Sequence, residues 1–278
     1  MRVAGGPPLR AGLADRYLAV LGVPRREPGR EALDELVAAH LVRVPFENVS
    51  KLYRLKRLGL AGLPPLELFL DGIERHRLGG TCYSNNIHLW SLLVTLGYEA
   101  RLCGADMSRP DVHAVIVVRL EGREHLVDAG YGAPFFSPLP LDDDQDRVIA
   151  WGHERYVLKP RDAGGRSRLE LHRGGAPRHG YVAKPGARAP DDFRDVIAES
   201  FRPDATFMNA VTICRFEPHG AVVVRNLDVL EANPWTFTSR ALPDRDALVA
   251  LAEERLGIPG EIVAEAVGAL RDLRDAWR

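Results

Sequence analysis

The chain of 278 residues is long enough to bury a large core and fits one compact unit of two or three subdomains. Hydrophobic residues make up 46% of it and charged residues 27%, the composition of an ordinary soluble globular protein. A net charge of -1 excludes the strongly basic footprint of a polyanion-binding protein, so we expect no nucleic-acid partner.

The sequence also predicts a protein without a membrane segment. No apolar run approaches the roughly 18 residues that a membrane span needs, and the first twelve residues lack the apolar stretch of a signal peptide. We therefore expect a cytoplasmic protein with no membrane partner. The 37 basic residues include few lysines, and Ala, Arg, Gly and Pro are abundant, which indicates the coding bias of a GC-rich bacterial genome.

The first third of the chain is predicted to be a helical bundle. Between residues 33 and 44 the apolar positions recur at three- and four-residue spacings, and the stripe ends at Pro45. Weaker patterns of the same kind cover residues 10–21 and 65–75. A further helix begins at Cys82 and stops at Gly97, and its apolar flank carries Asn86, Leu89, Leu93 and Leu96.

After residue 100 the pattern changes to strands. Residues 114–120 are rich in valine and isoleucine, Glu121 and Gly122 form a turn signal, and residues 124–128 run back. Further short strands, including 155–158 and 168–171, are separated by turn-rich segments. This middle third is predicted to be a small antiparallel β-barrel.

The last third mixes both kinds of element. We expect a helix near 191–201, strands at 207–217 and 220–230, and two terminal helices at 244–256 and 260–277. The predicted fold class is therefore α+β, with a helical bundle at 1–99, a β-barrel at 100–190 and an α/β lid at 191–278. The sequence shows no low-complexity linker between the three parts.

Cys82 is the candidate nucleophile. Gly79, Gly80 and Thr81 precede it, and a helical pattern follows it, so the sulfur is expected at a helix N-terminus. Unpaired backbone N–H groups and the helix dipole favour thiolate over thiol at that position. A thiolate is a nucleophile at neutral pH, so this segment predicts cysteine chemistry.

His113 and Asp128 are the candidate base and its orienting carboxylate. In a hairpin with a two-residue turn at Glu121 and Gly122, residues whose numbers sum to 243 face each other. His113 then lies opposite Gly130 and diagonal to Asp128 on the same face, within reach of the carboxylate. A three-residue loop would instead place the two side chains on opposite faces.

Each of these residues has an ordinary explanation when taken alone. An isolated cysteine is most often a small core residue, and a lone histidine or aspartate at a strand end is most often a satisfied polar group. Their combination is what nucleophilic cysteine catalysis requires, because the base must be held in one tautomer. The two remaining cysteines, Cys103 and Cys214, lie in predicted strands without a glycine approach and are interpreted as core residues.

The remaining histidines and cysteines do not predict a metal site. Three cysteines at wide separations suit neither a disulfide framework nor zinc, and the histidines lack metal-ligand spacing. His40 lies on the apolar face of its helix and is interpreted as a satisfied core histidine. The others are interpreted as surface or structural: His76, His88, His125, His153, His172, His179 and His219.

At these motifs the chain resembles the arylamine N-acetyltransferase family. The motifs are Val-Pro-Phe-Glu-Asn-Val at 44–49, Gly-Gly-Thr-Cys-Tyr at 79–83 with Asn86, His113 before a valine-rich strand, Val-Asp-Ala-Gly-Tyr-Gly at 127–132, Asp192 with Phe193, and Pro203 to Asn209. The resemblance implies a helical bundle, a β-barrel and an α/β lid. It also implies that Cys82 accepts an acyl group from a thioester, typically acetyl-coenzyme A, and passes it to an amine.

Departures from the family pattern surround the cysteine. The family usually has Arg-Gly-Gly before the cysteine and Glu two residues after it, whereas this chain has Leu78 and Ser84. This chain also has Asp106 and Met107 where the family commonly has Arg-Val. Arg75 and Arg77 lie nearby in the sequence. We expect acyl-cysteine chemistry to be retained with an altered donor or acceptor preference.

Three functions follow as hypotheses. The first is an N-acetyltransferase that uses acetyl-coenzyme A and aromatic amines or hydrazines. The second is a natural-product enzyme that releases a long acyl chain from an acyl carrier protein by macrolactam formation or Dieckmann-type cyclisation. The third is a non-catalytic or hydrolytic relative. We expect no tightly bound cofactor and no metal, and we expect substrate contacts from Phe46, Thr81, Tyr83, Asn86 and Tyr131.

Overall fold

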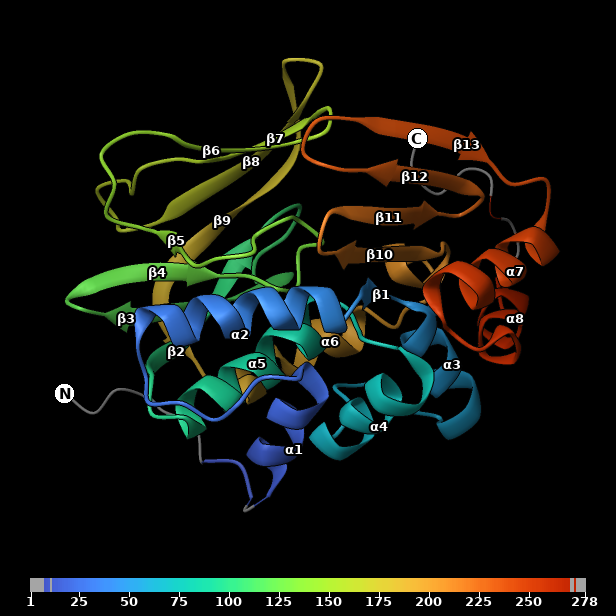
Figure 1. Ribbon diagram of the computed structural model, residues 1–278, viewed down its shortest axis with the longest axis horizontal. Coiled ribbons are helices and arrows are strands. Elements are labelled where there is room, and N and C mark those ends of the chain that lie inside the picture. Colours follow the sequence, from blue (N-terminus) through green and yellow to red (C-terminus); the bar gives the residue numbers. More distant parts are fainter. Residues whose placement is uncertain (1–7, 11, 271–272, 274–278) are drawn as a thin grey trace.

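The computed structural model describes residues 8–10, 12–270 and 273 of the chain. Helices, a curled antiparallel sheet, and a second antiparallel sheet flanked by helices follow one another along most of it (Figure 1). Its helices are α1 (Leu13–Leu21), α2 (Arg30–Arg43), α3 (Val49–Leu58), α4 (Leu66–His76), α5 (Cys82–Thr95), α6 (Arg194–Glu199), α7 (Arg245–Leu256) and α8 (Gly260–Gly268), with 3₁₀ turns η1 (Pro190–Phe193) and η2 (Thr206–Met208).

The strands form two sheets. Their bounds are β1 (Phe46–Glu47), β2 (Glu99–Asp106), β3 (His113–Leu120), β4 (Arg123–Val127), β5 (Leu139–Pro140), β6 (Arg147–Trp151), β7 (Glu154–Leu158), β8 (Ser167–Arg173), β9 (Ala176–Arg188), β10 (Thr212–Glu217), β11 (Gly220–Arg225), β12 (Asp228–Ala232) and β13 (Phe237–Ala241). In the larger sheet the order is β5-β4-β3-β2-β9-β8-β7-β6, and in the smaller it is β1-β10-β11-β12-β13.

The predicted α+β architecture is confirmed. The barrel of the middle third is a curled antiparallel sheet, a half-barrel with β5 and β6 as its edge strands. Its β3–β4 hairpin has the expected two-residue turn, since Leu120 pairs with Arg123 and both Glu121 and Gly122 have positive φ. The predicted register, and with it the common face of His113 and Asp128, therefore holds.

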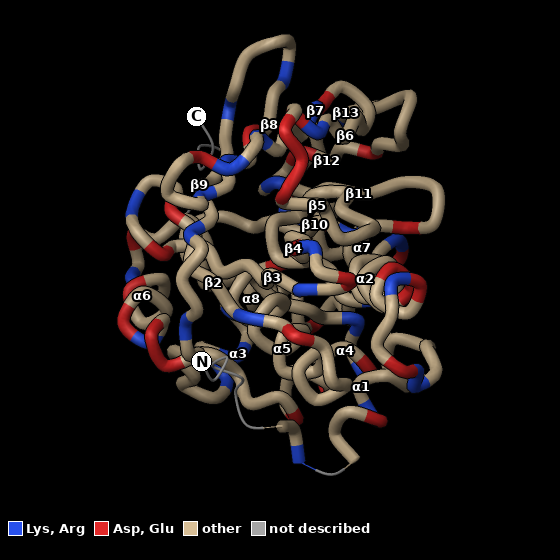
Figure 2. Tube along the Cα trace, turned by 90° about the vertical axis from the view of Figure 1, so that its left-hand side faces the viewer, with Lys and Arg blue, Asp and Glu red and all other residues tan. Residues whose placement is uncertain are grey.

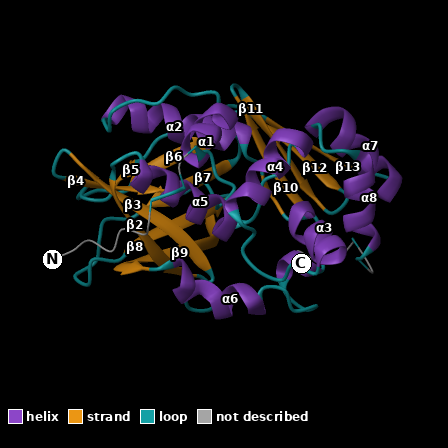
Figure 3. Ribbon diagram, turned by 90° about the horizontal axis from the view of Figure 1, so that it is seen from below, coloured by secondary structure: helices purple, strands orange, loops and turns teal. Residues whose placement is uncertain are grey.

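One apolar core joins the helices of the first third to the half-barrel. Helix α5 is buried on almost every side and packs on β2 and β3 (Figure 3). The apolar stripes of α1, α2 and α4 close the same core from outside. Burial of α5 places its first turn, with Cys82, at the junction of the helices and the sheet.

The smaller sheet draws elements from both ends of the chain. Strand β1 pairs with β10, with Phe46 opposite Cys214, and helix α3 shares an apolar core with α7 and α8. Figure 3 shows α3, α7 and α8 together beside this sheet. Residues 46–58 thus pack with the last third of the chain. The division into parts at residues 99 and 190 remains a prediction from the sequence.

Two strands of the last third differ from the sequence-based expectation. Residues 207–211 do not pair as a strand, because the Asn48 side chain donates to the carbonyls of Phe207 and Ala210 and holds this segment as a turn. The expected strand 220–230 is a hairpin, β11 and β12, that reverses at Asn226, a residue type that tolerates its left-handed φ of 54°.

The terminal helix and helix α3 also differ. Helix α8 ends at Gly268, and the rest of the predicted helix 260–277 falls largely outside the described residues. Helix α3 was not expected, because Lys51 and Arg54 interrupt the apolar pattern on its buried face. The periodicity of a helix predicts burial only when its inward residues are apolar.

Basic and acidic residues are interspersed along the chain trace (Figure 2). Among the described residues, no helix has both the length and the apolar character that crossing a membrane requires. The same residues contain no group of three His, Cys, Asp or Glu side chains arranged to hold a metal ion.

Two histidines are buried in the helical part with few polar contacts. His40 Nε2 lies 3.0 Å from the Tyr17 hydroxyl, and His88 Nε2 lies 3.0 Å from the Pro64 carbonyl oxygen. Burial lowers the pKa of His40 to about 3 and that of His88 to about 4. Both are therefore neutral in the folded protein at pH values where the unfolded chain protonates them.

The fold is predicted to lose stability as the pH falls below about 6.5, the ordinary pKa of histidine. Because the pKa values of the two histidines are lowered in the folded state, the unfolded chain binds more protons. At pH 5 each histidine therefore lowers the free energy of unfolding by about 2 kcal/mol. Urea unfolding at pH 7 and pH 5 measures this loss. His40→Gln and His88→Gln should each reduce it, and the exposed His219→Gln should not; equal losses in all three variants would contradict the assignment.

Candidate active site

Helix α5 begins where the chain passes close to β1. A Cβ atom on Gly79 would lie 2.0 Å from the Pro45 carbonyl oxygen, and one on Gly80 would lie 2.6 Å from Ser84 Cβ. Glycine is therefore required at both positions. The first intrahelical bond runs from Asn85 N–H to the Thr81 carbonyl, so the N–H groups of the preceding turn are unused within the helix.

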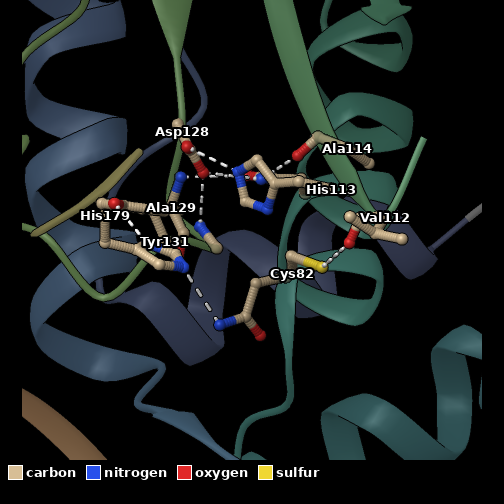
Figure 4. A network of polar contacts seen from close by, with 11 residues as sticks. Cys82, Val112, His113, Ala114, Asp128, Ala129, Tyr131 and His179 are labelled. Atoms are coloured by element: carbon tan, nitrogen blue, oxygen red, sulfur yellow. Dashed lines mark hydrogen bonds and ion pairs between the residues drawn. The ribbon is translucent and has the colours of Figure 1, made fainter. Parts of the chain in front are cut away.

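His113 and Asp128 come from the β3–β4 hairpin and meet in the interior. His113 Nε2 lies 2.8 Å from Asp128 Oδ2, and both residues are 2% exposed. This contact leaves Nδ1 of the ring free to face the other way. Figure 4 shows the imidazole between Asp128 and Cys82.

The Cys82 thiol completes the group from the start of α5. Its Sγ lies 3.9 Å from the Val112 carbonyl oxygen, next to His113 in the chain. Burial by itself would lower the pKa of His113, but the charge and the hydrogen bond of the Asp128 carboxylate, together with the nearby Cys82, outweigh it and raise the pKa. Burial would likewise raise the pKa of Asp128, and the charge of His113 instead lowers it. The geometry thus favours an imidazolium held between a carboxylate and a sulfur.

Asn86 ties the Asp128 segment to helix α5. Its Nδ2 donates to Asp128 Oδ1 at 2.8 Å and to the Ala114 carbonyl at 2.6 Å, and its Oδ1 accepts the Ala129 N–H at 2.9 Å. Asp128 Oδ1 also accepts the Gly130 N–H. The polar atoms of Asn86 are thus engaged within the protein, and its position suits orientation of Asp128 better than the substrate contact expected from the sequence.

Gly130 permits this close packing. A Cβ atom at this residue would lie 2.6 Å from Cys82 Cα and 2.7 Å from Asn86 Nδ2. The backbone after β4 therefore rests directly on the first turn of α5. Any larger residue would separate the nucleophile's helix from the hairpin that carries His113 and Asp128.

Aromatic rings surround His113. The centre of the Tyr181 ring lies 4.8 Å from the centre of the imidazole, and that of the Tyr131 ring lies 5.8 Å from it. The Tyr131 hydroxyl lies 2.8 Å from His179 Nδ1. Tyr181 was not identified from the sequence, because no motif marks it. The pairing of β2 with both β3 and β9 brings it there, since Ala105 pairs with His113 on one side and with Ala183 on the other.

Two cavities border this region. A large one of about 670 Å³ lies between the two sheets, and its lining includes Phe46 and Tyr131. A small one of about 30 Å³ lies against the start of α5, and its lining includes Thr81 and Tyr83. The structure therefore distributes the expected substrate-contact residues over two separate spaces.

Comparisons with known proteins agree with this architecture. The model of a family described as N-acetyltransferase matches residues 31–262 of the chain. The chain belongs to the arylamine N-acetyltransferase family. It is thus a member of a family of acyltransferase enzymes, as the resemblance of its motifs implied.

Curated relatives match about half of the chain. N-malonyltransferase FDB2 of Gibberella moniliformis is 33% identical over 155 residues, which cover 49% of this chain and 42% of that protein. Arylamine N-acetyltransferase 1 of Homo sapiens is 28% identical over 145 residues, 48% of each chain. The matched segment thus spans less than half the length of these relatives.

Solved structures match nearly the whole chain. The arylamine N-acetyltransferase of Nocardia farcinica has a TM-score of 0.75 and 25% identity, with 93% of this chain and 94% of that chain covered. The Mycobacterium marinum enzyme in complex with CoA has a TM-score of 0.76 and 22% identity, with 93% and 100% covered. The latter likeness is one of fold.

The departures from the family motif have distinct positions. Leu78 is buried and packs in the core of the smaller sheet, whereas Ser84 borders the small cavity. Asp106 forms an ion pair with Lys184 at 2.8 Å. Arg75 and Arg77 are exposed, so neither replaces the missing arginine next to the glycines. The basic side chains near the start of α5 come instead from helix α3.

Asn86→Ala is predicted to destabilise the fold by about 2 to 4 kcal/mol, because Ala114 O and Ala129 N–H lose their buried partner. It should also lower turnover by freeing Asp128. The matched control is Asn85→Ala, whose side chain makes only two bonds of 3.4 Å. Chemical denaturation of both variants measures the difference; an equal loss in the two would contradict the role given to Asn86.

Proposed function

We propose that the protein is a cysteine-dependent acyltransferase that takes an acyl group from a thioester onto Cys82 and transfers it to an amine. The observation that carries the proposal is the buried contact between His113 and Asp128, with Cys82 beside it at the start of helix α5. Membership of the arylamine N-acetyltransferase family supports it. In this proposal Cys82 is the nucleophile, His113 the base and Asp128 the orienting carboxylate.

The reaction has two halves. His113 takes the proton of Cys82, the thiolate attacks the carbonyl carbon of the thioester, and the donor thiol leaves with the proton, which forms acyl-Cys82. The amine then attacks this carbonyl, His113 takes the amine proton, and Cys82 leaves as the thiol. The backbone N–H of Cys82, which no helical bond uses, is our candidate for an oxyanion donor.

Acyl-coenzyme A is the proposed donor. The structure of the Mycobacterium marinum relative contains CoA, and the family model is that of an N-acetyltransferase. The donor is a cosubstrate in this scheme, so the mechanism needs no tightly bound cofactor or metal. A small-molecule amine is the proposed acceptor, and we propose that the reaction takes place in the cytoplasm.

The large cavity favours a second candidate function. Its volume of about 670 Å³ suits a drug-sized ligand and exceeds the need of an acetyl group and a simple aniline. Its lining includes aromatic and polar side chains, among them Trp151, His153 and Thr212. Such a space suits a long acyl chain that Cys82 releases by macrolactam formation or Dieckmann-type cyclisation. A carrier-protein thioester is the donor in this alternative.

Cys82→Ala is predicted to abolish covalent acylation while changing the free energy of unfolding by less than about 1 kcal/mol, because the lost side chain is small. Mass spectrometry of the intact protein after incubation with acetyl-coenzyme A detects the acyl adduct, and Cys103→Ala serves as the control. An adduct that persists in the Cys82 variant would remove this residue from the mechanism. A large loss of stability would favour a structural role.

Asp128→Asn should preserve the fold and reduce turnover by about three to four orders of magnitude, through loss of the oriented and charge-stabilised imidazole. The pH dependence of the residual rate should also change, because the carboxylate that raises the pKa of His113 is gone. Steady-state assays from pH 5 to pH 9 measure both effects. A rate within tenfold of the unmodified enzyme would contradict the assignment of Asp128.

The two candidate functions differ in their preferred substrate. Because Leu78 and Ser84 remove charged residues beside the nucleophile, we expect slow acetyl transfer from acetyl-coenzyme A to simple arylamines. A longer acyl chain gains roughly 0.8 kcal/mol for each buried methylene. Two incubations distinguish the candidate functions, and their products are analysed. One contains acetyl-coenzyme A and an aniline, and the other contains long thioesters that carry an internal nucleophile. Fast acetylation of the aniline would leave the ordinary family activity, and a cyclised product would establish ring-forming release.

A further inference from the structure

Helix α3 carries two basic side chains into the protein interior. Lys51 and Arg54, one helical turn apart, are 9% and 5% exposed. A buried charge is costly unless a partner of opposite charge compensates it. Within the described part of the chain, neither side chain forms an ion pair with a carboxylate, although the exposed Arg57 of the same helix pairs with Glu265.

The contacts of Lys51 are with neutral groups. Its Nζ donates to the carbonyl oxygen and to the hydroxyl of Ser200, both at 2.7 Å, and lies 4.1 Å from the centre of the Phe201 ring. Burial lowers the pKa of Lys51 to about 8, and a negative charge on the Cys82 sulfur would oppose this shift. Lys51 thus lies within electrostatic range of Cys82 without a charged partner of its own.

The contacts of Arg54 are weaker still. Its Nη2 donates to the Leu68 carbonyl at 3.4 Å, and Glu47 is the carboxylate whose charge acts on it. The oxygens of Glu47 accept the N–H groups of Ser50 at 2.8 Å and of Gly79 at 2.9 Å. Glu47 is therefore the carboxylate that acts on Arg54, and Lys51 forms no ion pair with a carboxylate among the described residues.

The small cavity of about 30 Å³ lies against these cations. Its lining includes Lys51 and Arg54 from α3, and Thr81 and Ser84 from the start of α5. Among the described residues, the hydroxyls of Thr81 and Ser84 have no hydrogen-bond partner. The volume holds about two water molecules, or one group of similar size. Two cations, two hydroxyls and the start of helix α5 therefore line this small, partly open cavity.

We propose that this cavity is a binding site for a single small carboxylate anion, of the size of formate or acetate. The anion provides a carboxylate partner to Lys51 and Arg54 and accepts hydrogen bonds from Thr81 and Ser84. A carboxylate suits the site because a guanidinium donates to its two oxygens in parallel. The site shares no lining residue with the large cavity and is independent of the acyl-transfer proposal.

The test measures thermal unfolding of the full chain in a zwitterionic buffer at constant ionic strength. Sodium formate or acetate should raise the Tm saturably, by about 3 °C at ten times the Kd. Sodium gluconate should have no such effect, because the anion is too large for the cavity. Chloride separates a carboxylate site from a general anion site: a rise with chloride equal to that with formate would overturn the carboxylate assignment.

Variants locate the effect. Lys51→Met keeps the length of the side chain and removes the charge, so the response to formate should disappear. Lys56→Met, on the exposed face of the same helix, should keep the response. A response that persists in the Lys51 variant, or no saturable response in the unmodified protein, would overturn the site.

Ser84 offers a test that needs no added anion. Because Ser84 lines the small cavity, Ser84→Glu places a side-chain carboxylate there, and Ser84→Gln places a neutral side chain of the same shape there. The glutamate variant should unfold several degrees above the glutamine variant and should no longer respond to formate. Equal Tm values in the two variants would show that the cavity does not require a negative charge.

Discussion

The contact between the first turn of helix α5 and the backbone after β4 is the constraint on which the rest of the site depends. Gly130 lies so close to Cys82 that a side chain would collide with it, and Asn86 joins α5 to Asp128, Ala114 and Ala129 by buried hydrogen bonds. A cysteine from the helical part and a histidine and aspartate from the half-barrel meet because this contact is tight. Their relative positions are held by main-chain packing, which tolerates little relaxation.

The same region joins the two sheets. Strand β1 follows directly on α2, pairs with β10, and passes against Gly79 and Gly80 before α3 begins. Figure 1 shows this early segment beside the strands of the last third. Cys82 thus lies where the helical part, the half-barrel and the last third of the chain converge, and it belongs to the core that joins the helices to the half-barrel.

Charge around the nucleophile is arranged differently from the family motif. Leu78 and Ser84 replace charged residues, and Lys51 and Arg54 bring positive charge to the same place from helix α3. The contacts of Asp128 and His113 do not involve these positions. The contacts that orient His113 and Asp128 therefore do not depend on Leu78 or Ser84, two positions that depart from the family motif.

The sequence by itself determined the elements whose signals are local. The β3–β4 register followed from Glu121 and Gly122, because a two-residue turn leaves only one pairing, and the start of α5 at Cys82 followed from the glycines before it. The candidate site of Cys82, His113 and Asp128 followed from these two signals together with the resemblance to a known family. Tertiary structure alone decided the rest. Tyr181 reaches His113 only through the pairing of β2 with β9, and residues 207–211 leave the strand because Asn48, far away in sequence, binds their carbonyls. Helix α3 could not be predicted for the same reason. Its inward face carries Lys51 and Arg54, and distant parts of the chain bury these side chains, so the apolar periodicity of the sequence does not indicate the helix.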